Sequence, residues 1–272
     1  LLEIPQPPKT LYLAGTLPQE DIILLTVVGS RKYTSYGKMA CEKIIEGLSG
    51  YPIAIVSGLA LGIDAIAHNA AMEAGLQTVA VPGSGLDERV LYPASNIGLA
   101  KEIIAQGGAL LSEFSPDFRA TQWSFPERNR IMAGLSRGVL VIEASEKSGT
   151  LITARLALEY NRDIYAVPGA IFSEGSRGTN TLIKRGATPI TSSADMLAAL
   201  GFEIVQNNFA AKESANPEEA LVLKLLMEPL PRDAIIQALN RPTHEVNMLL
   251  SVMELKGLIK EAIEADFYNI DI

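Results

Sequence analysis

Three short turns rich in glycine and serine carry residue types that bind phosphate. They read Gly29-Ser30-Arg31, Ser57-Gly58-Leu59-Ala60 and Lys147-Ser148-Gly149-Thr150. Backbone N–H groups exposed at such turns, near the start of a helix, bind anions, and the guanidinium of Arg31 adds a charge-assisted contact. Turns of this composition without a ligand are common, so each alone is a weak signal. The three together predict a phosphate-bearing ligand.

A fourth segment combines aromatic and cationic side chains. Phe125 is followed by Arg128, Asn129 and Arg130, and Trp123 lies two residues before it. Single-stranded nucleic acids bind such combinations, because bases stack on aromatic rings while arginine and lysine contact the phosphates. The alternative is that the two rings belong to the hydrophobic core.

The sequence lacks the residues that several other common kinds of site require. The chain has no GxxxxGK[ST] loop, and the segment 83–88 (GSGLDE) lacks the third glycine of a dinucleotide fingerprint, so we predict no nucleotide cofactor. Two histidines and one cysteine are too few for a structural zinc site, so we predict no metal. Asp64 and His68 are spaced i, i+4, but no nucleophile is placed to complete a catalytic set, and we interpret them as structural.

Short apolar runs alternate with helical patterns along most of the chain. The runs end in small residues and occupy 25–29, 53–58, 78–83, 109–112, 139–144 and 164–169, with a further candidate at 188–191. Amphipathic helices are predicted at 36–48, 63–74, 95–105, 128–135 and 150–160. Strands this apolar are buried on both faces, and their alternation with helices predicts a doubly wound α/β fold with a largely parallel sheet. Ligands bind such sheets at the carboxyl ends of the strands, where the small-residue turns fall.

The pattern changes after position 202. Residues 203–216 are polar and small and are predicted to be a linker between a domain at 1–202 and a second domain at 217–272. Helices are predicted at 218–227, 232–239 and 245–255, the last capped by Thr243 and ended by Gly257, and two strands at 258–263 and 267–270. Three helices and a hairpin in so short a segment predict a winged helix.

Charge is distributed unevenly. The chain has 23 basic and 31 acidic residues, a net charge of −8, and residues 203–272 alone have a net charge of −6. Residues 119–185 have a net charge of +4, which is typical of a localised anion site in an otherwise acidic protein. The apolar runs are too short to cross a membrane, and a single cysteine is consistent with a reducing cytoplasm.

These motifs together resemble the DprA/Smf family of bacterial DNA-processing proteins. The matching segments are VVGSR at 27–31, SGLALGIDAIAH at 57–68, FPERNRIMAGLS at 125–136, SGTLITA at 148–154, AVPG at 166–169 and GTNTLIKRGA at 178–187. They occur in unbroken order from about residue 7 to residue 200, and the segment after 217 looks like the winged-helix domain of many members. Many members also have an N-terminal helical domain, which we do not expect in the sequence given.

The resemblance implies an extended Rossmann-like fold that binds single-stranded DNA, forms a homodimer, protects incoming DNA and helps to load the recombinase RecA during natural transformation. It implies no catalytic turnover. Carried onto this sequence, the DNA-binding pocket comprises Gly29, Ser30, Arg31, Ser57, Gly58, Phe125, Arg128, Asn129, Arg130, Lys147, Ser148, Gly149 and Lys184. The acidic 203–272 segment would be repelled by a polyanion, so we expect it to bind protein or to regulate the pocket.

Two other functions stay open at this point. LONELY GUY-type phosphoribohydrolases are similar in fold and cleave nucleoside monophosphates with a catalytic glutamate, but Thr153 stands at the corresponding position here. Without that carboxylate, activation of water has no evident agent. A sensor that binds nucleotides but not DNA is the second alternative.

Overall fold

The computed structural model describes residues 1–202, 217–226, 230–239, 241–255, 259–261 and 267–270. The chain divides into two compact units, Leu1–Glu203 and Ile204–Ile272. Each unit is described by itself.

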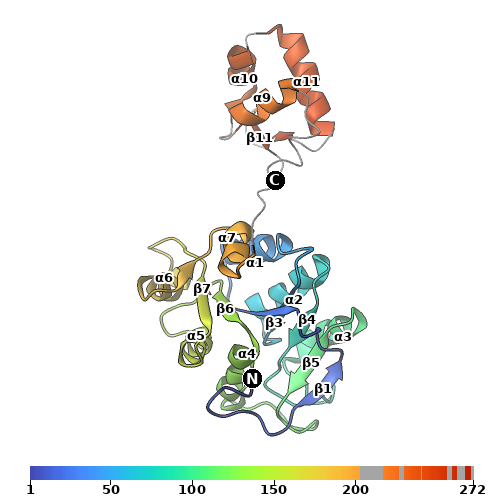
Figure 1. The fold of residues 1–272 in the computed structure, drawn as a ribbon, viewed down its shortest axis with the longest axis vertical. Coiled ribbons are helices and arrows are strands. Elements are labelled where there is room, and N and C mark those ends of the chain that lie inside the picture. Colours follow the sequence, from blue (N-terminus) through green and yellow to red (C-terminus); the bar gives the residue numbers. More distant parts are fainter. Residues whose placement is uncertain (203–216, 227–229, 240, 256–258, 262–266, 271–272) are drawn as a thin grey trace. The chain divides into compact units, whose positions relative to one another are not determined.

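The first unit is built on an eight-stranded sheet with the order β1-β5-β4-β3-β2-β6-β7-β8 (Figure 1). The β1 strand pairs antiparallel with β5, and all the other pairs are parallel. The strands are β1 (Tyr12–Gly15), β2 (Ile23–Val28), β3 (Ile53–Ser57), β4 (Thr78–Ala80), β5 (Ala109–Ser112), β6 (Gly138–Val141), β7 (Asp163–Ala166) and β8 (Thr188–Pro189).

Helices cover both faces of this sheet (Figure 1). The helices α1 (Ser35–Glu46), α2 (Ile63–Glu73), α3 (Ile97–Ala105) and α7 (Ser193–Ala199) form one layer, in which α1 contacts both α2 and α7 and α2 contacts α3. On the other face, α4 (Ser124–Leu135) packs against α5 (Thr150–Glu159), and α6 (Arg177–Lys184) lies beside β7. Two short 3₁₀ turns, η1 (Ala94–Asn96) and η2 (Glu174–Ser176), precede α3 and α6.

The core explains why these segments form a parallel sheet. Every residue of β3, β4, β5 and β6 is buried, as expected for strands covered by helices on both faces. The predicted doubly wound α/β fold is therefore confirmed. The β1 strand was not predicted; it is an edge strand, and its burial alternates between half-buried and exposed.

The α4 helix begins four residues earlier than predicted. The predicted helix starts at Arg128, after Pro126. In the structure α4 starts at Ser124, so Pro126 lies inside its first turn. Proline is tolerated there because the first N–H groups of a helix have no partner within the helix. The earlier start places Phe125 on the helix.

The second unit has the elements of a winged helix. It contains α9 (Pro217–Leu225), α10 (Arg232–Leu239), α11 (Thr243–Leu255) and a three-stranded antiparallel sheet of β9 (Leu230–Pro231), β10 (Ile259–Glu261) and β11 (Phe267–Ile270), in the order β10-β11-β9. Val222, Ile235, Val246, Leu250 and Met253 form its core. The predicted linker at 203–216 and the predicted helix end at Gly257 lie outside the described residues.

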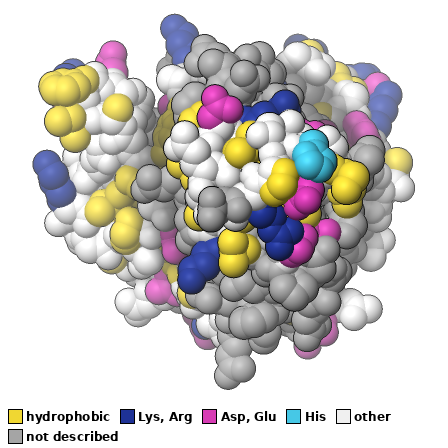
Figure 2. Space-filling model, turned by 90° about the horizontal axis from the view of Figure 1, so that it is seen from above, with side chains coloured by type: hydrophobic (Ala, Val, Ile, Leu, Met, Phe, Trp, Pro, Cys, Tyr) yellow, Lys and Arg dark blue, Asp and Glu magenta, His cyan; other side chains and the backbone are white. Residues whose placement is uncertain are grey.

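No one type of side chain dominates the face of the described residues that Figure 2 draws. Acidic, basic and hydrophobic side chains are interspersed over the face that it draws. Among the described helices, none combines the length and the apolar character needed to span a bilayer.

Candidate nucleic-acid interface

A cavity of about 730 Å³ opens at the carboxyl edge of the sheet in the first unit. Its walls come from the turn after β2, the first turns of α4 and α5, and η2. The lining residues are Val28, Gly29, Ser30, Arg31, Lys32, Ala60, Asp64, Phe125, Pro126, Arg128, Asn129, Met132, Ser145, Ser148, Gly149, Thr150, Ile152, Thr153, Glu174 and Gly175. The cavity thus brings the turns at 29–31 and 148–150 together with the segment 125–129.

The turn after β2 is held rigidly and presents Arg31 to solvent. The Ser30 hydroxyl donates to the Lys32 carbonyl at 2.7 Å and accepts from the Lys32 N–H at 3.1 Å. Behind the turn, Gly62 has a φ of +81°, and a Cβ there would collide with the Ser30 carbonyl and the Arg31 backbone. Only glycine fits this close approach in this conformation, so Gly62 fixes the backbone from which Arg31 projects.

Phe125 forms an aromatic wall beside Arg31. The guanidinium carbon of Arg31 lies 5.3 Å from the Phe125 ring centroid, which is a cation–π distance. On another side, the Tyr92 ring lies 5.6 Å from Phe125 at a tilt of 52°. Gly83 leaves the room that this packing needs, because a Cβ there would lie 2.6 Å from the Phe125 ring. A cation and an aromatic ring therefore share one wall of the cavity.

The start of α5 is tied to the turn after β2 by side-chain hydrogen bonds. The Thr150 hydroxyl donates to the Gly29 carbonyl at 3.0 Å, and the Ser148 hydroxyl donates to the Thr150 hydroxyl at 2.9 Å. Gly149 is exposed and has no other atoms within 4 Å of where a Cβ would be. The helix start is therefore held beside Arg31, with open space in front of it for an anion.

Arg128 lines the cavity but is buried. Its guanidinium donates to the Gly58 carbonyl at 2.6 Å and to the Val81 carbonyl, which ties the ends of β3 and β4 together. Asp64 accepts from the N–H groups of Gly58 at 3.1 Å and Ala60 at 3.4 Å. Burial lowers the pKa of Arg128 to about 10, and the nearby Asp64 carboxylate opposes this shift. Arg128 stays charged at neutral pH and acts as a brace under the cavity.

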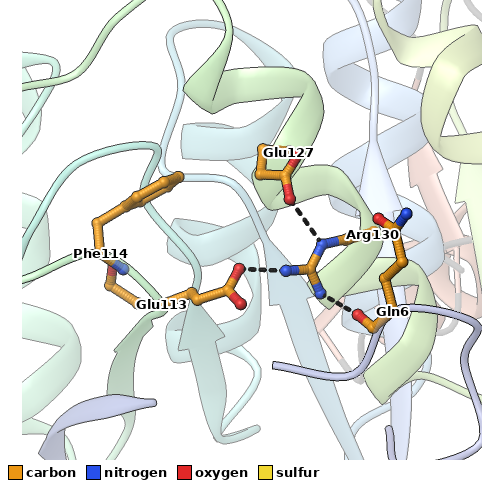
Figure 3. Close-up of polar contacts among 6 residues, drawn as sticks. Gln6, Glu113, Phe114, Glu127 and Arg130 are labelled. Atoms are coloured by element: carbon orange, nitrogen blue, oxygen red, sulfur yellow. Dashed lines mark hydrogen bonds and ion pairs between the residues drawn. The ribbon is translucent and has the colours of Figure 1, made fainter. Parts of the chain in front are cut away.

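Arg130 points away from the cavity, although it follows Arg128 by only two residues. Its guanidinium contacts the carboxylate of Glu113, donates to the Glu127 carboxylate at 3.1 Å and donates to the Gln6 carbonyl at 2.5 Å (Figure 3). Burial lowers the pKa of Arg130, but the hydrogen bonds to Glu113 and Glu127 outweigh burial and raise it. All three directions of the guanidinium are thus occupied by the protein itself.

Four more of the predicted site residues are absent from the cavity lining. The Ser57 hydroxyl is buried and donates to the Val27 carbonyl at 2.7 Å, and the backbone of Gly58 is bound by Asp64 and Arg128. Lys147 and Lys184 are exposed, the first just before the start of α5 and the second in the last turn of α6. Gly29, Ser30, Arg31, Phe125, Arg128, Asn129, Ser148 and Gly149 do line it.

Comparison with known protein families identifies the chain. A family model described as DNA recombination-mediator protein A matches residues 1–201, and one described as the DprA winged helix domain matches residues 207–262. The chain belongs to the DNA recombination-mediator protein A (DprA) family. The predicted resemblance and the predicted winged helix are confirmed.

Individual relatives agree with this assignment. Protein Smf of Escherichia coli is 38% identical over 261 residues, which cover 93% of this chain and 69% of that protein. The crystal structure of DNA processing protein A from Streptococcus pneumoniae superposes with a TM-score of 0.69 at 43% identity, covering 75% of this chain and 70% of that one. A structure of DNA processing protein A from Helicobacter pylori superposes with a TM-score of 0.65 at 33% identity, covering 73% of this chain and 89% of that one. It is described as giving insights into the single-stranded DNA binding mode of that protein.

Several residues of the cavity in this DprA-family chain were not predicted from its sequence. Lys32 is an exposed cation in the lining, and its position directly after Arg31 is a signal that could have revealed it. Thr150 belongs to a turn that the analysis singled out, but its hydrogen bond to Gly29 depends on the packing of α5. Glu174, from η2, is an exposed acidic residue in the lining that no motif indicated. Arg31 and Lys32 are thus the exposed cations of the lining, whereas Arg128 is buried near Asp64.

Asp64 and His68 occupy structural positions, in line with their interpretation from the sequence. The His68 Nδ1 atom lies 2.7 Å from the Thr78 hydroxyl, which itself donates to the Ile55 carbonyl. Burial and, to a smaller extent, the charge of Arg128 lower the pKa of His68 to about 3. At neutral pH the imidazole is therefore neutral.

The residue expected at the catalytic position of a phosphoribohydrolase is part of this cavity. Thr153 lines it, is buried and carries no carboxylate. Among the described residues, no group of three or more His, Cys, Asp or Glu side chains is arranged to hold a metal ion.

Proposed function

We propose that this chain binds single-stranded DNA in the cavity at the carboxyl edge of its sheet. The observation that carries the proposal is the placement of exposed Arg31 at 5.3 Å from the Phe125 ring, beside the start of α5. A cation, an aromatic face and the N-terminus of a helix are the groups that recognise a phosphate and its neighbouring base. The single-stranded DNA binding described for the Helicobacter pylori relative supports the same function here.

The roles of individual residues follow from their surroundings. Arg31 and Lys32 neutralise phosphate charge, and Asn129 offers an amide. Gly29 supplies backbone from the turn after β2, and Ser148 and Gly149 supply backbone at the start of α5. A base stacks on Phe125. This assignment gives Ser30 the role of shaping the turn, because its hydroxyl is bound to Lys32.

The remaining predicted residues contribute in other ways. The hydrogen bonds of Arg128, Ser57 and Gly58 hold together the turns beneath the cavity. Arg130 positions α4, which contributes Phe125 to the cavity. Lys147 and Lys184 are exposed cations that contact phosphates farther along the strand. None of these contacts requires catalytic turnover, and the proposal includes none.

Membership of the DprA family supports a proposal for the wider role of the chain. Proteins named DNA processing protein DprA are among the relatives of this chain. We propose that the chain acts as a homodimer in the cytoplasm, protects incoming single strands and helps to load the recombinase RecA during natural transformation and recombination. The acidic 203–272 segment contributes a protein-binding or regulatory surface, because its net charge of −6 opposes DNA binding.

Fluorescence anisotropy with a labelled oligo-dT strand tests the binding. The expected result is saturable binding that a duplex of equal length competes for poorly and that added salt weakens. A protein that leaves the oligomer unbound but binds mononucleotides would overturn the proposal in favour of a nucleotide sensor. Release of free base from a nucleoside monophosphate would overturn it in favour of an enzyme.

A further inference from the structure

A cluster of three aromatic rings lies next to the cavity in sequence but takes no part in its lining. The Phe114 and Phe118 rings stack with centroids 4.5 Å apart and an interplanar angle of 16°. The Trp123 indole meets both of them edge-on, with centroid distances of 5.8 Å to Phe114 and 5.6 Å to Phe118. We call these three residues the aromatic cluster.

The tryptophan of this cluster is supported from below but open to solvent. Its exposed fraction is 58%, whereas Phe114 and Phe118 are half-buried. Tryptophan gains most from burial among the aromatic residues, and an indole held by two edge-to-face contacts loses little further freedom when a second ring covers it. Trp123 therefore has the geometry of a platform rather than of a core residue.

The platform lies close to the proposed DNA site along the chain. Trp123 immediately precedes α4, and Phe125, which lines the cavity, is the second residue of that helix. Because consecutive Cα atoms are about 3.8 Å apart, the Cα atoms of these two residues are at most about 7.6 Å apart. A strand with one base on Phe125 therefore passes within reach of Trp123.

Charge near the cluster also suits a polyanion. Of the three acidic residues between positions 113 and 127, Glu113 and Glu127 are both bound by Arg130 (Figure 3). The third, Asp117, is followed two positions later by the exposed Arg119. The bridge from Arg130 also fixes the chain next to Phe114 against α4, which keeps the aromatic cluster in place. Arg130 thus lowers the negative charge and positions the platform at the same time.

We propose that Trp123 is a second base-stacking site, which binds the face of a nucleobase farther along the strand held by the cavity. The inference rests on the proposed single-stranded DNA function and deepens it. Every base has an aromatic face, so the site is tolerant of sequence and lengthens the bound strand beyond the phosphates at Arg31. It also assigns a direction to the strand, from Phe125 toward the segment 113–123.

The chain offers a direct probe, because Trp123 is its single tryptophan. An oligo-dT strand and a sugar-phosphate strand of equal length without bases are titrated, with anisotropy reporting binding and tryptophan emission reporting stacking. The expected result is a change in emission with the oligo-dT strand and none with the abasic strand at equal occupancy. Unchanged emission with bound oligo-dT would overturn the stacking site and leave the DNA-binding function standing.

Two variants test the contribution to affinity. Trp123→Ala is expected to raise the Kd for oligo-dT about 5- to 150-fold, the range of one base–aromatic stack, while Trp123→Phe keeps most of the affinity. Met39→Ala is the matched control, because Met39 is a hydrophobic side chain on α1 with the same exposed fraction of 58%.

The outcomes separate the two proposals. Equal affinity of wild type, Trp123→Ala and Met39→Ala would overturn the stacking site alone. Absence of any oligo-dT binding by wild type would overturn the proposed function and this site with it. If Trp123→Ala loses affinity for a protein partner but not for oligo-dT, the platform serves protein association and the inference is wrong.

Discussion

Arg128 and Arg130 lie two residues apart on α4, yet their guanidinium groups serve opposite sides of the helix. Arg128 donates to the carbonyls of Gly58 and Val81 under the cavity, and Arg130 bridges Glu113 and Glu127 away from it. A helix advances about 100° per residue, so side chains two positions apart point in nearly opposite directions. Neither arginine is free to follow a DNA backbone, and in the proposed function that task falls to Arg31 and Lys32.

Substitutions of Arg31 and Arg130 are therefore expected to differ in what they change: the first should lower the affinity for DNA, and the second should mainly lower the stability. Arg31→Ala removes an exposed charge-assisted contact and should weaken oligo-dT binding by about 1–2 kcal/mol without loss of stability. Arg130→Gln should lower the free energy of unfolding by about 1–3 kcal/mol and should weaken binding only indirectly, because it frees Glu113 and Glu127 beside the aromatic cluster. Anisotropy titration and chemical denaturation of both variants measure the two effects. A slope of log K against log salt that is about 0.7 shallower in stable Arg130→Gln protein would place Arg130 on the DNA.

Substitution of Arg128 should act mainly on stability. Arg128→Met leaves the carboxylate of Asp64 buried without its cation, so the free energy of unfolding should fall by about 3–5 kcal/mol. Adding Asp64→Asn should recover part of that loss, because the uncompensated charge is removed. The half-buried neighbour Asn129 is the control, since Asn129→Ala breaks no hydrogen bond in the described part of the chain. Urea denaturation compares wild type, Arg128→Met, the double variant and Asn129→Ala. An unchanged midpoint for Arg128→Met would contradict the role of Arg128 as a structural brace.

The sheet and the main turns could be predicted from the sequence because their signals are local. Runs such as 53–58 and 139–144 are apolar enough to require burial on both faces, and Gly29, Ser30 and Arg31 directly follow β2. The same reasoning misses β1, an edge strand of four residues whose burial alternates between half-buried and exposed.

The orientation of individual side chains in the site could not be predicted in this way. The partners of Arg130 include Glu113, 17 residues away, and Gln6, 124 residues away, so its environment is a product of tertiary packing. Arg128 looks like a phosphate ligand by type, but its hydrogen bonds reach the carbonyls of Gly58 and Val81, which directly follow β3 and β4. Residue type and spacing identified the region of the site without identifying which cations are free.

The close approach of Gly62 to the turn after β2 can be tested with a matched glycine. Gly62→Ala forces a Cβ against Ser30 and Arg31, so it should lower stability by about 1–3 kcal/mol and also weaken oligo-dT binding. Gly75 has a φ of +72° and nothing within 4 Å of a Cβ position. Gly75→Ala should therefore cost about 1–2 kcal/mol of stability with no effect on binding. Equal affinities of the two folded variants would show that Gly62 does not position Arg31.

The salt dependence of binding should reflect the small number of free cations in the site. Each neutralised phosphate of a single strand contributes about −0.7 to the slope of log K against log salt, and we expect a slope of about −2 to −4. Arg31→Ala should make the slope shallower by about 0.7, whereas Arg130→Gln should not change it. Anisotropy titrations at several salt concentrations give the three slopes. A wild-type slope near zero would contradict phosphate binding.

Acid should destabilise the first unit through His68. Burial lowers its pKa to about 3 from an ordinary value of 6.5, so between these values the unfolded chain binds a proton that the folded chain does not. The stability is therefore fully present above pH 6.5 and is lost as the pH falls toward 3, with a slope of up to about 1.4 kcal/mol per pH unit from this group. Chemical denaturation followed by Trp123 emission at several values between pH 7 and pH 4 measures the slope, because that tryptophan belongs to the same unit.

The second histidine provides the control for this measurement. His244 is exposed, so His244→Gln should keep the wild-type slope. His68→Gln removes the buried imidazole and should flatten the slope by about 1 kcal/mol per pH unit, even though the variant is less stable at pH 7. If both variants retain the wild-type slope, the acid sensitivity comes from carboxylates and His68 is protonated in the folded protein. If His68→Gln alone is flat, the neutral imidazole beside Thr78 is what makes the sheet under the cavity depend on pH.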